Sequence, residues 1–191
     1  MINLKDILKS SSLAGIFISI AGLVFLTVGG IIGSMLFAFG LFGVIITSSH
    51  LYTGKAGFEQ NLVLLTVILV GNVIGCAMAG LATQLMSPGV IETATQLIEA
   101  RINAGWYICI LKGIGCGIIM STIILASKKD VWYPLMFGIP VFILSGFYHS
   151  VADAYYFFVS PKLSYIPYWL CVVLGNYFGC KLLFLKKLIH D

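Results

Sequence analysis

Residues 71–76 read Gly-Asn-Val-Ile-Gly-Cys, and residues 175–180 read Gly-Asn-Tyr-Phe-Gly-Cys. Four of the six positions are identical at a separation of 104 residues. Two further correspondences occur in the same order at nearly the same separation: Leu8-Lys9 with Leu111-Lys112, and Phe37 with Phe142. Matches that recur at one separation are the mark of an internal repeat. The sequence therefore predicts a duplicated unit of about 100 residues.

The composition places this duplicated unit in a membrane. Hydrophobic residues make up 60% of the 191, and charged residues only 9%, against a usual ~25% charged. Eighteen charged side chains are too few to cover a soluble globule of this size. The net charge is only +4, and no run of Lys and Arg is present to bind phosphates. A soluble enzyme, a disordered chain and a nucleic-acid binder are excluded, and we predict an integral all-α membrane protein.

Six apolar segments are long enough to cross a hydrocarbon core, which takes ~20 helical residues. They cover residues 11–29, 34–52, 61–85, 105–127, 131–159 and 165–185. The longest connection, 87–104, has the spacing of a short amphipathic surface helix. We therefore expect one transmembrane channel domain over 1–191: repeat one at about 1–86, a surface linker at 87–104, and repeat two at about 105–191.

The two predicted repeats have opposite orientations in the membrane. Each contains three spans, so the second starts on the side where the first ends. Inverted repeats of this kind are typical of channels and transporters. The charges then give the orientation, because cytoplasmic loops are rich in Lys and Arg. One side carries Lys5, Lys9, Lys55, Lys128, Lys129, Lys181, Lys186 and Lys187, and the other only Arg101 and Lys162. Both termini are predicted to be cytoplasmic, in what we expect to be a bacterial inner membrane.

The second and fifth segments are predicted to be broken helices. The second ends in the polar run Thr47-Ser48-Ser49-His50. The fifth has 29 residues, which is ~43 Å at ~1.5 Å per residue, and its middle reads Ser145-Gly146-Phe147-Tyr148-His149-Ser150. Broken backbone at membrane depth is tolerated where it is buried or lines a cavity. Breaks in corresponding spans of two halves indicate a substrate pathway.

Polar residues in the spans are the candidates for that pathway, since their burial in lipid is costly. His149 is either a proton-exchanging or anion-contacting pore group, or a neutral histidine bonded between helices. Lys112 either attracts anions to the outer vestibule or extends its amine to the interface. Thr53 can donate to an anion or to His149, or can cap a turn. Asn176 and Asn72 either line the path or join helices by hydrogen bonds.

Enzyme chemistry finds little support in the sequence. His149 and Asp153 could supply two metal ligands, whereas a catalytic metal usually takes three from the protein. The adjacent residues His149 and Ser150 cannot occupy the facing positions of a catalytic triad. The five cysteines lie in apolar stretches without CxxC spacing, which indicates packing. We expect no enzymatic activity, no cofactor and no metal.

These same stretches resemble the signatures of the formate/nitrite transporter family. Leu51-Tyr52-Thr53-Gly54 looks like its second-helix signature, usually Leu-Phe-Thr-Gly-Asn. Residues 146–153 look like its fifth-helix signature, usually Gly-Phe-Glu-His-Ser-Val-Ala-Asn, with Tyr148 in place of Glu and Asp153 in place of the last Asn. Residues 112–116 and 174–179 resemble the fourth and sixth. The resemblance covers all six spans in order.

The resemblance implies an aquaporin-like fold, a homopentamer with one pore in each protomer, and passage of small monovalent anions. One constriction would be formed by Phe37 and Phe142, and a cytoplasmic one by Leu41, Leu51 and Tyr52. Between them would lie Thr53, His149 and Asn176, and Lys112 would be the family's fourth-helix lysine. Asp153 is a possible modulator, which could keep His149 protonated or repel anions.

The predicted function is therefore a channel or transporter for small anions of weak acids, with formate or nitrite favoured, coupled to protons at His149. Its partners would be the anion, the proton, the lipid bilayer and further copies of the chain, and not nucleic acid. Hydrosulfide, acetate or lactate are alternative substrates. A neutral-solute or water channel of related fold and a non-transporting membrane scaffold are alternative functions.

Overall fold

The computed structural model describes residues 3–189, with side chains described as far as residue 183. Residues 1–2 and 190–191 of the predicted domain lie outside it, as do the side chains of Lys186 and Lys187. Within the described range every regular element is a helix. The elements are α1 (Leu4–Val28), α2 (Gly30–Leu36), α3 (Ala38–Ile46), α4 (Tyr52–Lys55), α5 (Leu62–Met86), η1 (Pro88–Val90), α6 (Ile91–Ala104), α7 (Trp106–Ser127), α8 (Tyr133–Leu144), α9 (Ser150–Val159), η2 (Leu163–Tyr165) and α10 (Ile166–Ile189).

Four helices in the described chain are apolar and long enough to cross a membrane. They are α1, α5, α7 and α10. The 25 residues of α1 correspond to ~38 Å at ~1.5 Å per residue. This helix begins seven residues before the predicted start at residue 11, because Asn3 caps it by accepting from the backbone N–H of Lys5 at 3.1 Å. Sequence hydropathy detects the apolar part of a helix but not a polar first turn stabilised by its cap.

The two predicted breaks are present. The chain leaves helical geometry between α3 and α4, at residues 47–51, and between α8 and α9, at residues 145–149. Ser48 and Gly146 have left-handed backbone, with φ of 53° and 68°. The segment predicted at 34–52 begins earlier, at Gly30, directly after Gly29 with φ of 64°. It is also divided at Phe37, so its apolar part consists of the shorter helices α2 and α3.

The Gly-Asn-x-x-Gly-Cys segments bring the long helices into close contact. A Cβ atom on Gly75 of α5 would collide with the backbone carbonyl of Ser12 in α1. A Cβ atom on Gly175 of α10 would collide in the same way with the carbonyl of Ile110 in α7. Small residues let backbones approach this closely in membrane helix pairs. The repeated segments thus pair α5 with α1 and α10 with α7.

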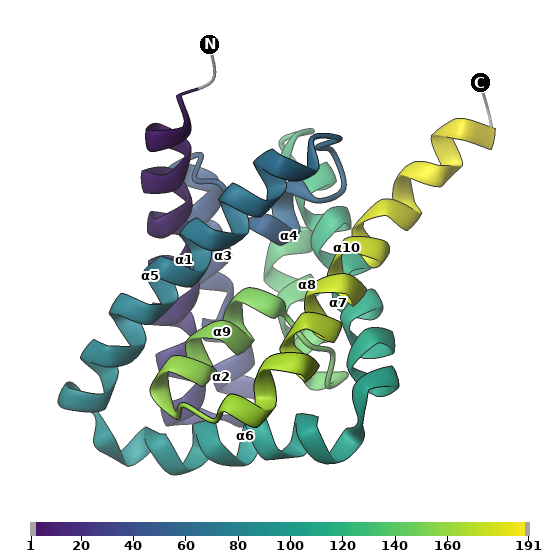
Figure 1. Ribbon diagram of the computed structural model, residues 1–191. Helices are drawn as coiled ribbons and strands as arrows, with labels where there is room; N and C mark the ends of the chain where they lie inside the picture. The colour runs from purple at the N-terminus through teal and green to yellow at the C-terminus, as the bar shows by residue number, and fades with distance from the viewer. Residues whose placement is uncertain (1–2, 190–191) are drawn as a thin grey trace.

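The linker predicted at 87–104 forms η1 and α6. Figure 1 shows α6 lying across one end of the molecule, while both ends of the chain lie at the opposite end. The broken elements α8 and α9 lie between the α1/α5 side and the α7/α10 side (Figure 1). Because α4, which follows the first break, packs against α9, which follows the second, the two breaks lie close together and polar side chains of both can meet.

Candidate functional site

A buried hydrogen bond joins the two broken segments. Oγ1 of Thr53, in α4, lies 2.9 Å from Nε2 of His149, the residue that precedes α9. His149 also caps α9, because its Nδ1 accepts from the backbone N–H of Ala152 at 3.1 Å. A nitrogen that accepts carries no hydrogen in neutral imidazole, so Nε2 carries it and donates to Thr53. The hydroxyl hydrogen of Thr53 is then available to a further acceptor.

The two repeated asparagines hold the breaks in place. Asn176 accepts from the backbone N–H of Ser150 at 2.8 Å and donates to the carbonyls of Tyr148 and Gly113, both at 2.9 Å. These bonds surround the break before α9. All hydrogen-bonding positions on its amide nitrogen are used, so in this structure Asn176 joins backbone segments.

Asn72 makes the equivalent set at the other break. It accepts from the backbone N–H of Tyr52 and donates to the carbonyls of His50 and Ser11, all at 2.8 Å. Both asparagines are fully buried. Backbone groups that leave a helix in an apolar interior need such partners, which explains why an asparagine stands at both positions.

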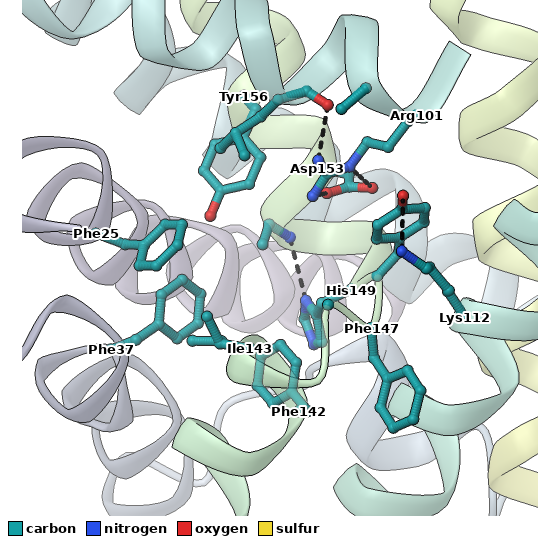
Figure 2. Close-up of a pocket in the computed structure, with 15 residues that line it drawn as sticks. Phe25, Phe37, Arg101, Lys112, Phe142, Ile143, Phe147, His149, Asp153 and Tyr156 are labelled. Carbon is teal, nitrogen blue, oxygen red and sulfur yellow. Dashed lines mark hydrogen bonds and ion pairs between the residues drawn. The ribbon is translucent and has the colours of Figure 1, made fainter. Parts of the chain in front are cut away.

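A cavity of about 210 Å³ lies beside His149 on the side of α6, and we call it the α6-side cavity. Its apolar wall includes Phe25, Phe37 and Phe142. The rings of Phe37 and Phe142 meet edge to face with centroids 6.1 Å apart, and the His149 ring lies 6.0 Å from that of Phe142. Figure 2 shows Phe25 and Phe37 on one side of His149, and Arg101 and Lys112 on the other.

The cations Arg101 and Lys112, together with the tyrosine Tyr148, form much of the polar wall of this cavity. Lys112 and Arg101 both line it. The Arg101 guanidinium lies 4.4 Å from the centroid of the Tyr148 ring, and the Lys112 amine lies 4.9 Å from it. The Lys112 amine is also 3.5 Å from the Tyr148 hydroxyl. Lys112 therefore faces the cavity beside Tyr148, the residue that replaces the glutamate of the family signature.

Asp153 is paired within the protein. Its Oδ1 lies 2.9 Å from Nη2 of Arg101, and its Oδ2 accepts from Nε of Arg101 at 2.9 Å and from the Tyr165 hydroxyl at 2.6 Å. Burial alone lowers the pKa of the Arg101 guanidinium, but the adjacent carboxylate holds that pKa above its ordinary value. Both carboxylate oxygens thus have partners other than His149.

Sequence reasoning missed Arg101 as a site residue. The sequence places Arg101 in the predicted surface linker, where its only expected role is that of an outer charge. Two facts in the sequence could have indicated the pair. Arg101 is the chain's single arginine, and Asp153 is the one acid deep in a predicted span. A buried acid of this kind needs a partner.

A second cavity, of about 300 Å³, lies beside α4, and we call it the α4-side cavity. It is lined by Leu51 and Gly54, which flank the pair Tyr52-Thr53, and by the cations Lys55 and Lys128. Burial and the neighbouring Lys55 lower the pKa of Lys128. The Thr53–His149 bond therefore lies between two cavities that both contain lysine.

Of the residues predicted to form the cytoplasmic constriction, Leu51 lines this cavity, whereas Leu41 and Tyr52 are buried and are not part of its lining. Leu41 is fully buried in α3. The Tyr52 hydroxyl donates to the carbonyl of Val173 in α10 at 3.3 Å. Among the described residues, no group of three His, Cys, Asp or Glu side chains is placed to hold a metal ion. The site thus combines apolar walls, the Thr53–His149 imidazole–hydroxyl pair and lysines in both cavities.

Comparisons with known proteins agree with this architecture. A search of curated proteins returns no significant match. Among solved structures, one described as an "FNT family ion channel" superposes with a TM-score of 0.84 at 22% identity, covering 99% of this chain and 91% of its own. Another, a "Pentameric formate channel with formate bound", superposes with a TM-score of 0.82 at 20% identity, covering 98% of this chain and 97% of its own. The fold is therefore that of these channels.

The family model described as "Formate/nitrite transporter" matches residues 2–186. Four described helices are long and apolar enough to cross a membrane. The chain is accordingly an integral membrane protein, and it belongs to the formate/nitrite transporter family.

Proposed function

We propose that this protein is a channel for small monovalent anions of weak acids, with formate or nitrite as the first candidates. The observation that carries the proposal is the Thr53–His149 hydrogen bond between two cavities that both contain lysine. The lysines would raise the local anion concentration at both entrances. The phenylalanines on one side and Leu41, Leu51 and Tyr52 on the other would exclude hydrated ions from the centre.

We also propose that the chain forms one domain with six membrane crossings, arranged as two inverted repeats. The support comes from contacts that recur in both halves. Asn72 and Asn176 bind corresponding breaks in the same way. The Cys76 thiol lies 3.3 Å from the carbonyl of Val151, and the Cys180 thiol lies 3.2 Å from the carbonyl of Thr53, so each half contacts the helix that follows the break of the other half. Four long helices and two broken ones would make the six crossings.

The assembly we propose is a homopentamer in a bacterial cytoplasmic membrane, with both termini in the cytoplasm. A pentameric formate channel shares the fold. Many large apolar side chains are exposed on the outside, among them Ile31, Leu85 and Phe137, and these would contact lipid or neighbouring protomers. The mass of the detergent-solubilised complex, corrected for bound detergent, tests the pentamer.

Passage through the centre would require neutralisation of the anion. Moving a bare charge into a low-dielectric region costs tens of kcal/mol by ideal estimates, whereas a neutral acid loses much less. We propose that the anion crosses wholly or partly protonated, and that a proton moves with it down the combined gradient. The Nε2–H of His149, acting through Thr53, would supply the polar contact between the two apolar constrictions. His149 would then set how the flux depends on pH.

Flux measurements in proteoliposomes test the proposal. Wild-type protein is assayed at several pH values with formate, nitrite, hydrosulfide, acetate and lactate, and His149→Asn is assayed beside it. We expect saturable uptake of the smallest anions, faster at lower pH, and a reduced rate with a flatter pH profile in the variant. An unchanged profile would remove His149 from proton coupling. Water or glycerol flux without anion flux would indicate a neutral-solute channel, and no flux would indicate a scaffold.

A further inference from the structure

A buried ion pair connects the linker helix α6 to α9, the helix that follows the second break. Arg101, on α6, contacts both carboxylate oxygens of Asp153, on α9, at 2.9 Å. The guanidinium also donates to the carbonyl of Leu97 at 2.7 Å, and the Tyr165 hydroxyl donates to the same carboxylate at 2.6 Å. The exposed fractions of the two side chains are 9% for Arg101 and 1% for Asp153. Leaving either charge alone in such a site is costly.

The pair also changes the charge of the α6-side cavity. Three side chains of the charged residue types line it: Arg101, Lys112 and Asp153. Their sum is +1. Because Arg101 lies against the carboxylate, the charge that remains available is that of Lys112, whose described polar neighbour is the uncharged Tyr148. Figure 2 shows Arg101 and Asp153 together, with Lys112 as a separate group on the same side.

Arg101 further contributes to the position of Lys112. Its guanidinium stacks on the Tyr148 ring at 4.4 Å. The same ring lies 4.9 Å from the Lys112 amine. A contact chain therefore runs from Asp153 through Arg101 and Tyr148 to Lys112, and it links the linker helix to the cation that faces the cavity.

We propose that Arg101 is a positioning and specificity-determining residue, which neutralises Asp153 and docks α6 on α9 so that the cavity presents one positive charge, that of Lys112, to an entering anion. Without this pairing the aspartate next to the pore would cancel Lys112 and the cavity would no longer favour anions. The inference rests on the proposed anion channel and adds the Arg101–Asp153 ion pair to the residues that determine its selectivity.

Three variants change the cavity charge in different directions. Asp153→Asn, which restores the residue of the family signature, raises it to +2. Arg101→Gln lowers it to 0, and the double variant returns it to +1. A unit charge ~10 Å away at an effective dielectric constant near 20 changes the local anion concentration by roughly tenfold. At low ionic strength we expect the formate KM to fall by about tenfold in Asp153→Asn, to rise by about tenfold in Arg101→Gln, and to return within about threefold of wild type in the double variant.

A purely structural role predicts a different pattern. Both single variants would then lower kcat without opposite shifts in KM, and the double variant would not recover. Raising the salt to ~0.5 M should compress the KM differences, because screening weakens charge effects. If Arg101→Gln fails to fold, Arg101→Lys serves as the second variant. Because it keeps the positive charge, we expect Arg101→Lys to have the wild-type KM. Glu99→Gln is the matched control, because it breaks the exposed Glu99–Lys162 pair of the same helix and should leave KM unchanged.

Hydrogen exchange of residues 91–104 separates this inference from the proposed function. Arg101→Gln should speed amide exchange in α6 by at least tenfold, while Glu99→Gln should not. If wild-type protein carries no anion flux, the proposed function and the charge argument both fail, and the exchange result still decides the docking. If wild type transports formate and the two single variants shift KM in the same direction, the inference is overturned while the function stands.

Discussion

Replacing Asn176 by leucine removes a side chain that satisfies broken backbone at the centre of the molecule. The leucine is similar in size but offers no hydrogen bond. The Ser150 N–H and the Tyr148 carbonyl lose their partner, whereas the Gly113 carbonyl lies inside α7 and keeps its helical bond. Two buried backbone groups are therefore left unsatisfied beside His149.

The expected loss follows from these two groups. Each unsatisfied buried donor or acceptor costs ~1–3 kcal/mol, so the total is ~2–6 kcal/mol. For a chain of this length, 1 kcal/mol lowers Tm by ~2–4 °C. A loss of ~4 kcal/mol therefore corresponds to a fall of roughly 12 °C. Since the break also positions His149, formate flux should decrease as well.

Thermal unfolding in detergent, followed by tryptophan fluorescence or by loss of the monodisperse chromatographic peak, measures this change. Asn72→Leu should give a similar fall, because Asn72 makes the equivalent bonds to Tyr52 and His50. Asn61→Ala is the control, because it removes one exposed helix cap, worth ~1 kcal/mol. If Asn176→Leu and Asn72→Leu unfold like wild type, then the asparagines do not hold the breaks and the reasoning is wrong.

Three further outcomes follow from the same geometry. Thr53→Val should lower formate flux at least tenfold, because the Nε2–H of His149 loses its acceptor, while Thr53→Ser should keep most of the flux in proteoliposomes. Gly175→Ala should lower Tm by several degrees, since its Cβ collides with an α7 carbonyl and overpacking costs ~1–3 kcal/mol; Gly89→Ala, with open space around it, should not. The pKa of Lys128 lies below the ordinary 10.5, so the α4-side cavity should lose positive charge at a lower pH than an ordinary lysine would. The KM for anions entering from that side should therefore rise as the pH increases toward that pKa, and Lys128→Arg should remove the rise.

Several features of the fold could be read from the sequence because they depend on local patterns. Apolar runs of 20 residues predict long helices wherever they occur. The polar runs at 47–50 and 145–150 predicted breaks that the structure has. The first turn of α1 was missed, because one asparagine cap and not hydropathy determines it. The inverted repeat and the six crossings stay predictions supported by the paired asparagine contacts.

The candidate site was less accessible to sequence reasoning. Thr53, His149 and Asn176 are buried around the two breaks and Lys112 is half-buried, but the partners of these residues come from distant segments. Asp153 was expected to act on His149 or on the anion. Its carboxylate instead faces Arg101, 52 positions earlier in the chain, and the linker helix that carries this arginine looked like a surface element.

The sequence by itself determined the class of the protein, because eighteen charges among 191 residues leave no soluble alternative. It also indicated the breaks, because polar runs recur at corresponding places in two of the apolar segments. Only the tertiary structure decided which nitrogen of His149 donates, whether Asn176 lines the pathway or holds the broken backbone, and which residue neutralises Asp153. Hydropathy and helical spacing act over a few neighbouring residues, whereas a hydrogen bond or an ion pair depends on a distance of about 3 Å between segments that the fold alone brings together.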